Sequence, residues 1–172
     1  MLSEPITLYK LMILYMLRMA KFPLKNSRIS EFFLEHEYTD YFTFQQAINE
    51  LAEARLITQE TMRNTTQYEI TREGEEALGY FGKTISDAIK ADINEFLKKN
   101  RIRLRDEVNV VADYYKAGTS DINVRLEVRE GRTTMISINI PVSDEDQAER
   151  LCDNWQKDNQ RLYAFLMQEL LK

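Results

Sequence analysis

The chain of 172 residues carries 23 Lys and Arg against 28 Asp and Glu, which gives a formal net charge of −5 at pH 7. Five Gly, three Pro and 44% hydrophobic residues exclude collagen-like and disordered chains, and they indicate one globular domain or two small ones. A single Cys and a single His exclude an internal disulfide and a His/Cys zinc site, so we expect a reducing cytoplasm and no cofactor. The apolar run 11–17 is too short to cross a bilayer, and residues 1–20 lack the basic leader of a signal peptide.

The first 82 residues follow the order helix, helix, helix, hairpin, helix. The first of these helices is apolar on nearly all sides, which indicates burial on two sides or against a partner. We expect Gly74 to let the fourth helix pack closely against a neighbour. The predicted elements are a helix at 6–19, a helix capped by Asn26 and Ser27, a helix capped by Thr43, strands at 56–62 and 67–70 around a turn at 63–66, and a helix capped by Thr71.

The second half changes from helical to alternating periodicity. Alternation such as Ile122, Val124 and Leu126 predicts antiparallel strands with one wet face. Pro141 is expected to end the last strand, and Ser143 to open a long helix whose apolar stripe covers the dry face. The predicted elements are a hinge at 82–84, a helix at 85–100, strands at 106–116, 122–128 and 134–140, and a final helix reaching about residue 171.

These elements predict an α+β protein. We expect an N-terminal winged helix-turn-helix, then a helix, then a C-terminal three-stranded antiparallel sheet packed by one long helix. The corresponding domains are a winged-helix domain at 1–82, a connecting helix at 83–104 and a β-β-β-α domain at 105–172.

Two resemblances follow from these residues. The helix at 43–54, the hairpin and the pattern Tyr68-x-Ile70-Thr71-x-x-Gly74-x-x-x-Leu78 resemble winged-helix repressors of the multiple-antibiotic-resistance and phenolic-acid types. Nearly the whole chain resembles an uncharacterised bacterial family, domain of unknown function 4364. That likeness is carried by residues 5–11 (PITLYKL), 41–47 (YFTFQQA), 112–116 (ADYYK) and 152–157 (CDNWQK). It implies a winged helix joined to a small sheet-and-helix domain, and brings no activity with it.

The winged-helix resemblance implies which residues would face DNA. In such folds the third helix enters the major groove, the hairpin reaches phosphate or the minor groove, and the start of the second helix contacts phosphate. Gln and Asn side chains on the third helix could bind adenine through two hydrogen bonds. The candidates are Thr43, Gln45, Gln46 and Asn49 on the third helix, Lys25, Ser27 and Arg28 at the second, and Arg63, Asn64, Thr65 and Thr66 in the hairpin.

The charge distribution opposes strong DNA binding. Residues 1–82 carry eight Lys and Arg against twelve Asp and Glu, a net charge of −4, whereas non-specific binding usually needs a basic surface. Glu50 and Glu53 also share the exposed side of the third helix. A solvated polar helix face in this fold is therefore the alternative interpretation.

We expect a DNA-binding transcriptional regulator that acts as a cytoplasmic homodimer on double-stranded DNA. A two-fold dimer would place two recognition helices in successive major grooves. The alternative is a non-catalytic protein-interaction scaffold that uses the acidic winged helix or the polar sheet face of Arg125, Glu127 and Arg129. In either case residues 105–172 could sense a small-molecule effector. The residues expected to form the dimer lie on the first helix and are Leu8, Leu11, Met12, Tyr15 and Met16.

Enzymatic chemistry finds no support in the sequence. His36 lies in a turn without a nucleophile suggested by spacing, and Cys152 lies on an apolar helix stripe beside Trp155, as a buried inert thiol would. No phosphate loop, nucleophile elbow or metal-spaced cluster is present. We therefore expect a protein without catalytic residues or a metal site.

Overall fold

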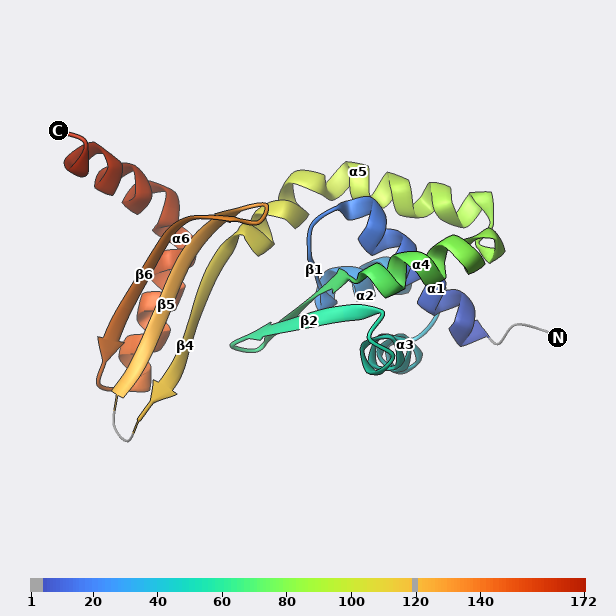
Figure 1. The fold of residues 1–172 in the computed structure, drawn as a ribbon, viewed down its shortest axis with the longest axis horizontal. Coiled ribbons are helices and arrows are strands. Elements are labelled where there is room, and N and C mark those ends of the chain that lie inside the picture. The colour runs from blue at the N-terminus through green and yellow to red at the C-terminus, as the bar shows by residue number, and fades with distance from the viewer. Residues whose placement is uncertain (1–4, 119–120) are drawn as a thin grey trace. The chain divides into compact units, whose positions relative to one another are not determined.

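The computed structural model describes residues 5–118 and 121–172 and has a mixed α+β fold (Figure 1). Within these residues it contains six α-helices and two three-stranded antiparallel sheets. The chain divides into two compact units. The first comprises Met1–Thr61 and Thr65–Val108, and the second comprises Met62–Asn64 and Asn109–Lys172. The expected α+β class is confirmed.

The first unit combines helices with a sheet in the strand order β1-β3-β2. Its elements are α1 (Pro5–Ala20), β1 (Leu24–Lys25), α2 (Asn26–Glu35), α3 (Tyr41–Glu53), β2 (Ile57–Met62), β3 (Thr65–Ile70), α4 (Arg72–Phe81), a 3-10 turn η1 (Gly82–Thr84) and α5 (Asp87–Asn109). The 3-10 turn occupies the expected hinge. This order, with a hairpin between α3 and α4, is compatible with a winged helix.

Helix α1 lies at the centre of the first core. Seven of its residues are buried, and Met12, Ile13 and Met16 have no exposed surface. A helix that is apolar on all sides needs neighbours on all sides, and α3, α4 and β3 of the same unit are among those in contact with it. Among residues 5–118 and 121–172, no helix has the length and hydropathy needed to cross a membrane.

Two helices of the first unit begin differently from expectation. Helix α3 begins at Tyr41 because the Asp40 carboxylate accepts the Thr43 N–H at 2.8 Å. Thr43 therefore lies inside the first turn and does not cap it. The negative charge of an Asp at this position also stabilises the helix, because the N-terminal end of the helix dipole is positive. Helix α2 follows Lys25 without any side-chain cap, so the expected caps Asn26 and Ser27 are wrong.

The hairpin and α4 pack closely. The hairpin turns over two residues, Arg63 and Asn64, because β3 begins at Thr65. Thr71 caps α4 as expected, accepting the Gly74 N–H at 3.0 Å. A Cβ atom at Gly74 would collide with the Leu56 carbonyl oxygen and lie 2.9 Å from the Ile70 side chain. The expected close approach at Gly74 is confirmed.

Helix α5 is longer than expected, since residues 106–109 continue it instead of opening a strand. The alternation of Val108 with Val110 suggested a strand, but Leu104 and Val108 are also one helical turn apart. Both are buried, at 1% and 4% exposure. Strand β4 consequently begins at Val110, and the first unit includes the helix that the sequence set apart as a connector.

The second unit is an antiparallel meander of β4 (Val110–Ala117), β5 (Asp121–Glu130) and β6 (Thr133–Val142), with α6 (Glu145–Leu170) packed on one face (Figure 1). Its core includes Val124, Cys152 and Trp155. The Trp155 indole N–H donates to the Glu127 carbonyl oxygen at 3.1 Å, which joins helix to sheet. The expected three-stranded sheet under one long helix is confirmed.

Two boundaries of the second unit differ from expectation. Pro141 does not end β6 but pairs with Asn123 inside it. Because β6 is an edge strand, a residue without an N–H can be accommodated there. Helix α6 is capped by Asp144, which accepts the Gln147 N–H at 2.8 Å, and not by Ser143.

Candidate nucleic-acid interface

Helix α3 turns a polar side to solvent. Its opposite side is buried through Phe44, Ala47, Ile48 and Leu51, each at most 1% exposed. This burial fixes the orientation of the helix, so the residues expected to read DNA lie outward. Gln46 and Asn49 are exposed, and Thr43 and Gln45 are half-buried.

A chain of hydrogen bonds holds the amides of α3 in place. The Asn26 side-chain nitrogen donates to Gln45 Oε1 at 3.1 Å and to the Tyr68 hydroxyl at 3.1 Å. Gln45 Nε2 then donates to Asn49 Oδ1 at 3.2 Å. Since Tyr68 is only 3% exposed, the network is anchored in the core. It fixes the side-chain oxygen of the exposed Asn49 as an acceptor from Gln45.

The same side of α3 carries negative charge. Glu50 accepts from Lys10 Nζ at 2.9 Å and from Gln46 Nε2 at 3.0 Å, and these two hydrogen bonds hold the pKa of Glu50 below its ordinary value. The backbone hydrogen bond from Thr43 likewise lowers the pKa of Asp40. Both carboxylates are therefore ionised at neutral pH. Lys10 balances one of them, while the Asp40 charge lies at the helix N-terminus, where a phosphate would otherwise be favoured.

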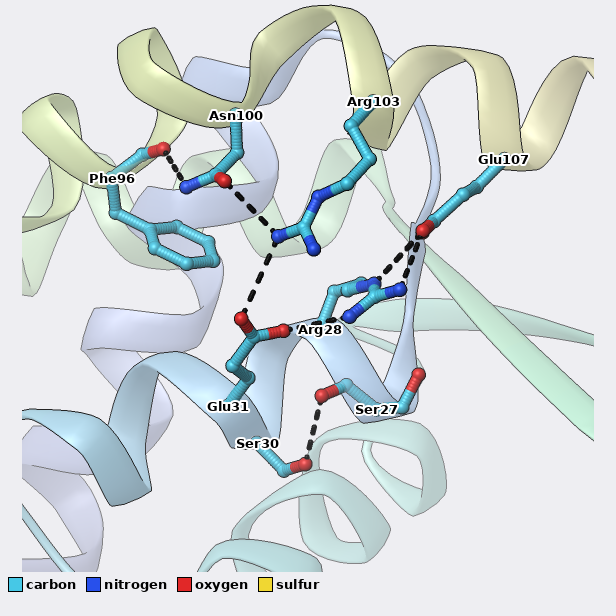
Figure 2. Close-up of polar contacts among 8 residues, drawn as sticks. All are labelled: Ser27, Arg28, Ser30, Glu31, Phe96, Asn100, Arg103 and Glu107. Carbon is cyan, nitrogen blue, oxygen red and sulfur yellow. Dashed lines mark hydrogen bonds and ion pairs between the residues drawn. The ribbon is translucent and has the colours of Figure 1, made fainter.

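Arg28 is held by two carboxylates, as Figure 2 shows. Its Nε lies 3.0 Å from both Glu107 oxygens, its Nη2 lies 2.7 Å from Glu107 Oε1, and its Nη1 lies 2.9 Å from Glu31 Oε2. The hydrogen bonds to Glu107 and then Glu31 raise the pKa of Arg28 above its already high ordinary value. A planar guanidinium suits this two-pronged contact. In this structure Arg28 joins α2 to the end of α5.

The surroundings of Arg28 reinforce that role (Figure 2). Arg103 lies 3.5 Å from the other Glu31 oxygen and donates to Asn100 Oδ1 at 3.0 Å. Of the other two phosphate candidates at α2, Ser27 is exposed, and Lys25 is half-buried with its backbone paired to Gln67.

The hairpin candidates divide between the two units. Arg63 and Asn64 belong to the second unit, and Thr65 and Thr66 to the first. Within the second unit, the Arg63 backbone N–H donates to Asp113 at 3.1 Å, and its guanidinium binds Asp153 at 3.0 Å and also Glu149. Burial opposes the Arg63 charge, but the hydrogen bond to Asp153 and the charge of Glu149 outweigh it and raise the pKa of Arg63.

The remaining hairpin residues keep polar groups near the surface. Asn64 is exposed, while Thr65 and Thr66 are half-buried. The Thr66 and Thr61 hydroxyl oxygens lie 3.1 Å apart, which links β3 to β2. The structure thus gathers the amides of α3 but ties Arg28 and Arg63 to carboxylates.

The α1 residues expected to form a dimer face the interior of their own unit. Leu11, Met12 and Met16 are at most 6% exposed, and Leu8 and Tyr15 pack against the same core. The Tyr15 ring lies 5.8 Å from Lys90 Nζ, and its hydroxyl hydrogen-bonds with Asn94 of α5. Three of the five residues that motivated this dimer face are thus buried by the chain itself, and the other two are half-buried.

Sequence reasoning missed a basic stretch on α5. Residues 98–105 include five basic side chains and no acidic one, and all five are exposed. Figure 1 draws α5 and α3 on different sides of the first unit, so this stretch does not adjoin the α3 face. Counting charge by helix instead of by domain would have found it. These residues are Lys98, Lys99, Arg101, Arg103 and Arg105.

The polar face of the second sheet is ion-paired within itself. Glu127 is only 8% exposed and lies 3.0 Å from Arg129 and 3.9 Å from Arg125.

Burial raises the pKa of Cys152 to about 11, which keeps this thiol protonated near neutral pH. Among residues 5–118 and 121–172, no His, Cys, Asp and Glu cluster is suited to hold a metal ion.

The chain was compared with protein families, curated proteins and solved structures. A family model described as "Domain of unknown function (DUF4364)" matches residues 9–170. No curated protein matches the chain, and no solved structure does.

Proposed function

Because the chain belongs to this family of unknown function, its role has to be inferred from its own geometry, and we propose that it is a DNA-binding transcriptional regulator of winged-helix type. In this proposal it acts as a homodimer in the cytoplasm and catalyses no reaction. Double-stranded DNA is its partner, contacted by the exposed side of α3.

The observation that carries the proposal is that hydrogen bonds hold the side-chain amides of Gln45 and Asn49 on α3 in place. Base readout needs hydrogen-bonding groups held in place before DNA arrives, because ordering long side chains on binding costs free energy. The network from Tyr68 through Asn26 and Gln45 to Asn49 supplies such order. Exposed Gln46 adds a second amide one turn before Glu50.

The charges set the expected character of binding. Two of the three basic candidates, Arg28 and Arg63, are paired with carboxylates, so few phosphate contacts remain near α3. We therefore expect weak non-specific binding and a shallow salt dependence, since each phosphate contact adds to the slope of log K against log salt. Base contacts would then provide a large share of the affinity for a specific site.

Genomic pull-down sequencing with purified protein at about 50 mM and about 200 mM salt tests the proposal. Enrichment of a two-fold symmetric motif, retained in part at the higher salt, is the expected result. Retention of fragments without a shared motif would reject sequence-specific DNA binding.

Asn49→Ala tests the α3 face directly. Loss of one well-formed base contact should lower discrimination between the enriched motif and a mismatched site by about 5- to 150-fold, equivalent to about 1–3 kcal/mol. Fluorescence anisotropy with both duplexes measures the ratio. Asn154→Ala, at an exposed position of α6, is the matched control and should leave the ratio unchanged. An equal ratio in all three proteins would remove α3 from the interface.

A second candidate, a protein-interaction scaffold, is favoured by the acidic character of residues 1–82, which carry four more acidic than basic side chains. Glu50 and Glu53 lie on the α3 surface, and Asp40 occupies its N-terminus. A partner with a basic surface would complement these charges. In that case the second unit would serve as a sensor for a small-molecule effector. A pull-down without a DNA motif, followed by capture of a basic protein that Glu50→Lys abolishes, would support the scaffold.

A further inference from the structure

The last third of α6 has an apolar side that its own unit does not cover. The buried residues of the helix are Ala148, Cys152, Trp155 and Asn159, and no residue after Asn159 is buried. In Figure 1 the C-terminal end of α6, drawn in red, extends beyond the sheet. The exposed apolar residues in this part are Leu162 (37%), Phe165 (57%), Met167 (40%), Leu170 (77%) and Leu171 (75%).

This apolar side continues the stripe that packs on the sheet. Leu162, Leu166 and Leu170 follow Trp155 and Asn159 at spacings of three and four residues, so they lie on the same side of the helix. A stripe of this kind normally faces another element. Exposed leucines and a phenylalanine at consecutive turns mark a contact surface.

The charges beside this stripe indicate what covers it. Asp158 and Arg161 form an ion pair at 3.4 Å, and Glu169 and Lys172 form another at 2.6 Å. Arg161 lies four residues before Phe165 and Glu169 four residues after it. Asp158 and Lys172 lie seven residues before and after the same residue. All four charges therefore lie on the Phe165 side of the helix. Residues at equal distances before and after Phe165 carry opposite charges.

A second copy of the helix, running antiparallel, complements this order. With Phe165 on a two-fold axis, Arg161 of one copy faces Glu169 of the other, and Asp158 faces Lys172. In antiparallel helix pairs, flanking residues on one side face the same flank of the partner. The two leucine stripes then meet beside the charged flank.

We propose that residues 158–172 of α6 form the homodimer interface, by antiparallel packing against the same residues of a second copy. The inference specifies the homodimer of the proposed function. It is measured without DNA, however, so either proposal can fail without the other.

A lipid surface fits the charges less well. Residues 156–172 carry three basic and two acidic side chains, whereas helices that lie on anionic membranes have a strongly basic polar face. The alternating signs are useful to a self-complementary helix pair and have no role at a membrane.

Sedimentation equilibrium on the full chain tests the proposal. We expect a reversible dimer with a dissociation constant on the order of 1 µM, since a helix pair of this length is a small interface. A monomer at ~100 µM protein would overturn the proposal. Co-sedimentation with vesicles of anionic phospholipid should leave the protein in the supernatant, and binding through Leu166 and Leu170 would assign the surface to lipid instead.

Charge reversal tests the register. Arg161→Glu places two carboxylates opposite each other at both ends of the interface, and Glu169→Arg places two guanidiniums there. Each single change should weaken dimerisation by about 10-fold or more, and the double variant R161E/E169R should return it to within about 3-fold of the original. Arg150→Glu, at an exposed position in the covered half of α6, is the matched control and should have no effect.

A cross-link tests the position of the two-fold axis without disturbing charge. A short bis-maleimide should join two copies of Phe165→Cys, because that residue faces its own counterpart, while Gln160→Cys at an exposed position should remain unlinked. The native Cys152 is fully buried and does not compete. Failure of the double variant to recover, or equal cross-linking at both positions, would overturn the antiparallel arrangement.

Discussion

The sequence around Arg28 fits two roles, a contact to DNA phosphate and an ion pair between helices. An arginine in the first turn of the second helix is typical of a phosphate contact. The structure instead places Glu107, which lies 79 positions away in sequence, against the Nε and Nη2 edge of its guanidinium. With Glu31 completing the contact, the residue connects two helices of the first unit.

Replacement of Arg28 should therefore lower stability. We expect Arg28→Ala to reduce the free energy of unfolding by about 1–2 kcal/mol, because the partly buried Glu107 loses this cation and Glu31 keeps only the longer contact to Arg103. Arg28→Lys should recover only part of this, since an ammonium cannot make the two-pronged contact. Urea denaturation followed by circular dichroism measures both.

Arg72→Ala is the control for that measurement, because Arg72 is 87% exposed and forms only a surface pair with Glu76. It should change the free energy of unfolding by less than about 0.5 kcal/mol. If Arg28→Ala were equally harmless but weakened DNA binding, Arg28 would be a phosphate contact and the ion pairs would be incidental.

At the scale of single elements, helix α4 depends on one glycine. Gly74 lies where the helix meets the residue before the hairpin, against the Leu56 carbonyl oxygen. Gly79, five residues later in the same helix, has no neighbouring atom within 4 Å of the place that a methyl group would take, so its missing side chain serves no packing purpose. The two glycines share a helix and differ in what surrounds them.

Alanine at these two positions should have opposite effects. Gly74→Ala should lower the free energy of unfolding by about 2–3 kcal/mol, because backbone atoms must move to admit the methyl group. Gly79→Ala should raise it by about 0.5–1 kcal/mol through helix propensity alone. Parallel urea titrations decide the matter, and a similar shift in both variants would show that α4 does not pack closely at Gly74.

At the scale of the whole molecule, the net charge of −5 conceals two unlike surfaces. The exposed side of α3 carries amides and carboxylates, whereas residues 98–105 of α5 carry only positive charge. In the regulator that we propose, few cations lie beside α3, so binding two half-sites at once would raise the affinity for DNA. The proposed functions of α3 and α6 are thus linked through the dimer.

This link predicts the behaviour of a monomeric variant. If Arg161→Glu prevents dimerisation, the affinity of this variant for a two-fold symmetric DNA site should fall by about 100-fold or more. The reason is that no tethered second copy is present to bind the other half-site. Anisotropy titrations with the full site and with one half-site measure the loss. Affinity for the half-site should stay the same. Unchanged affinity for the full site would mean that one copy suffices for DNA binding.

The sequence by itself determined most of the elements, because their signals are local. Alternation in residues 122–128, the apolar stripe of α3 and the Thr71 cap all lie within a few positions of the element that they predict. The α+β class followed from these patterns. The boundary at residues 106–109 failed because two local signals compete there, and Val108 fits a strand and a helix alike.

Only the tertiary structure decided which polar and apolar side chains remain exposed for contact with a partner. The pairing of Arg28 with Glu107, the burial of Met12 and Met16, and the exposure of Leu170 depend on segments far apart in the chain. Periodicity shows that a helix has an apolar side, but not whether a neighbour covers it. Coverage and charge pairing are set by the three-dimensional packing of distant elements. Because most of the apolar surface of α1 is covered within its own unit, the dimer interface that we propose lies at the end of α6 instead.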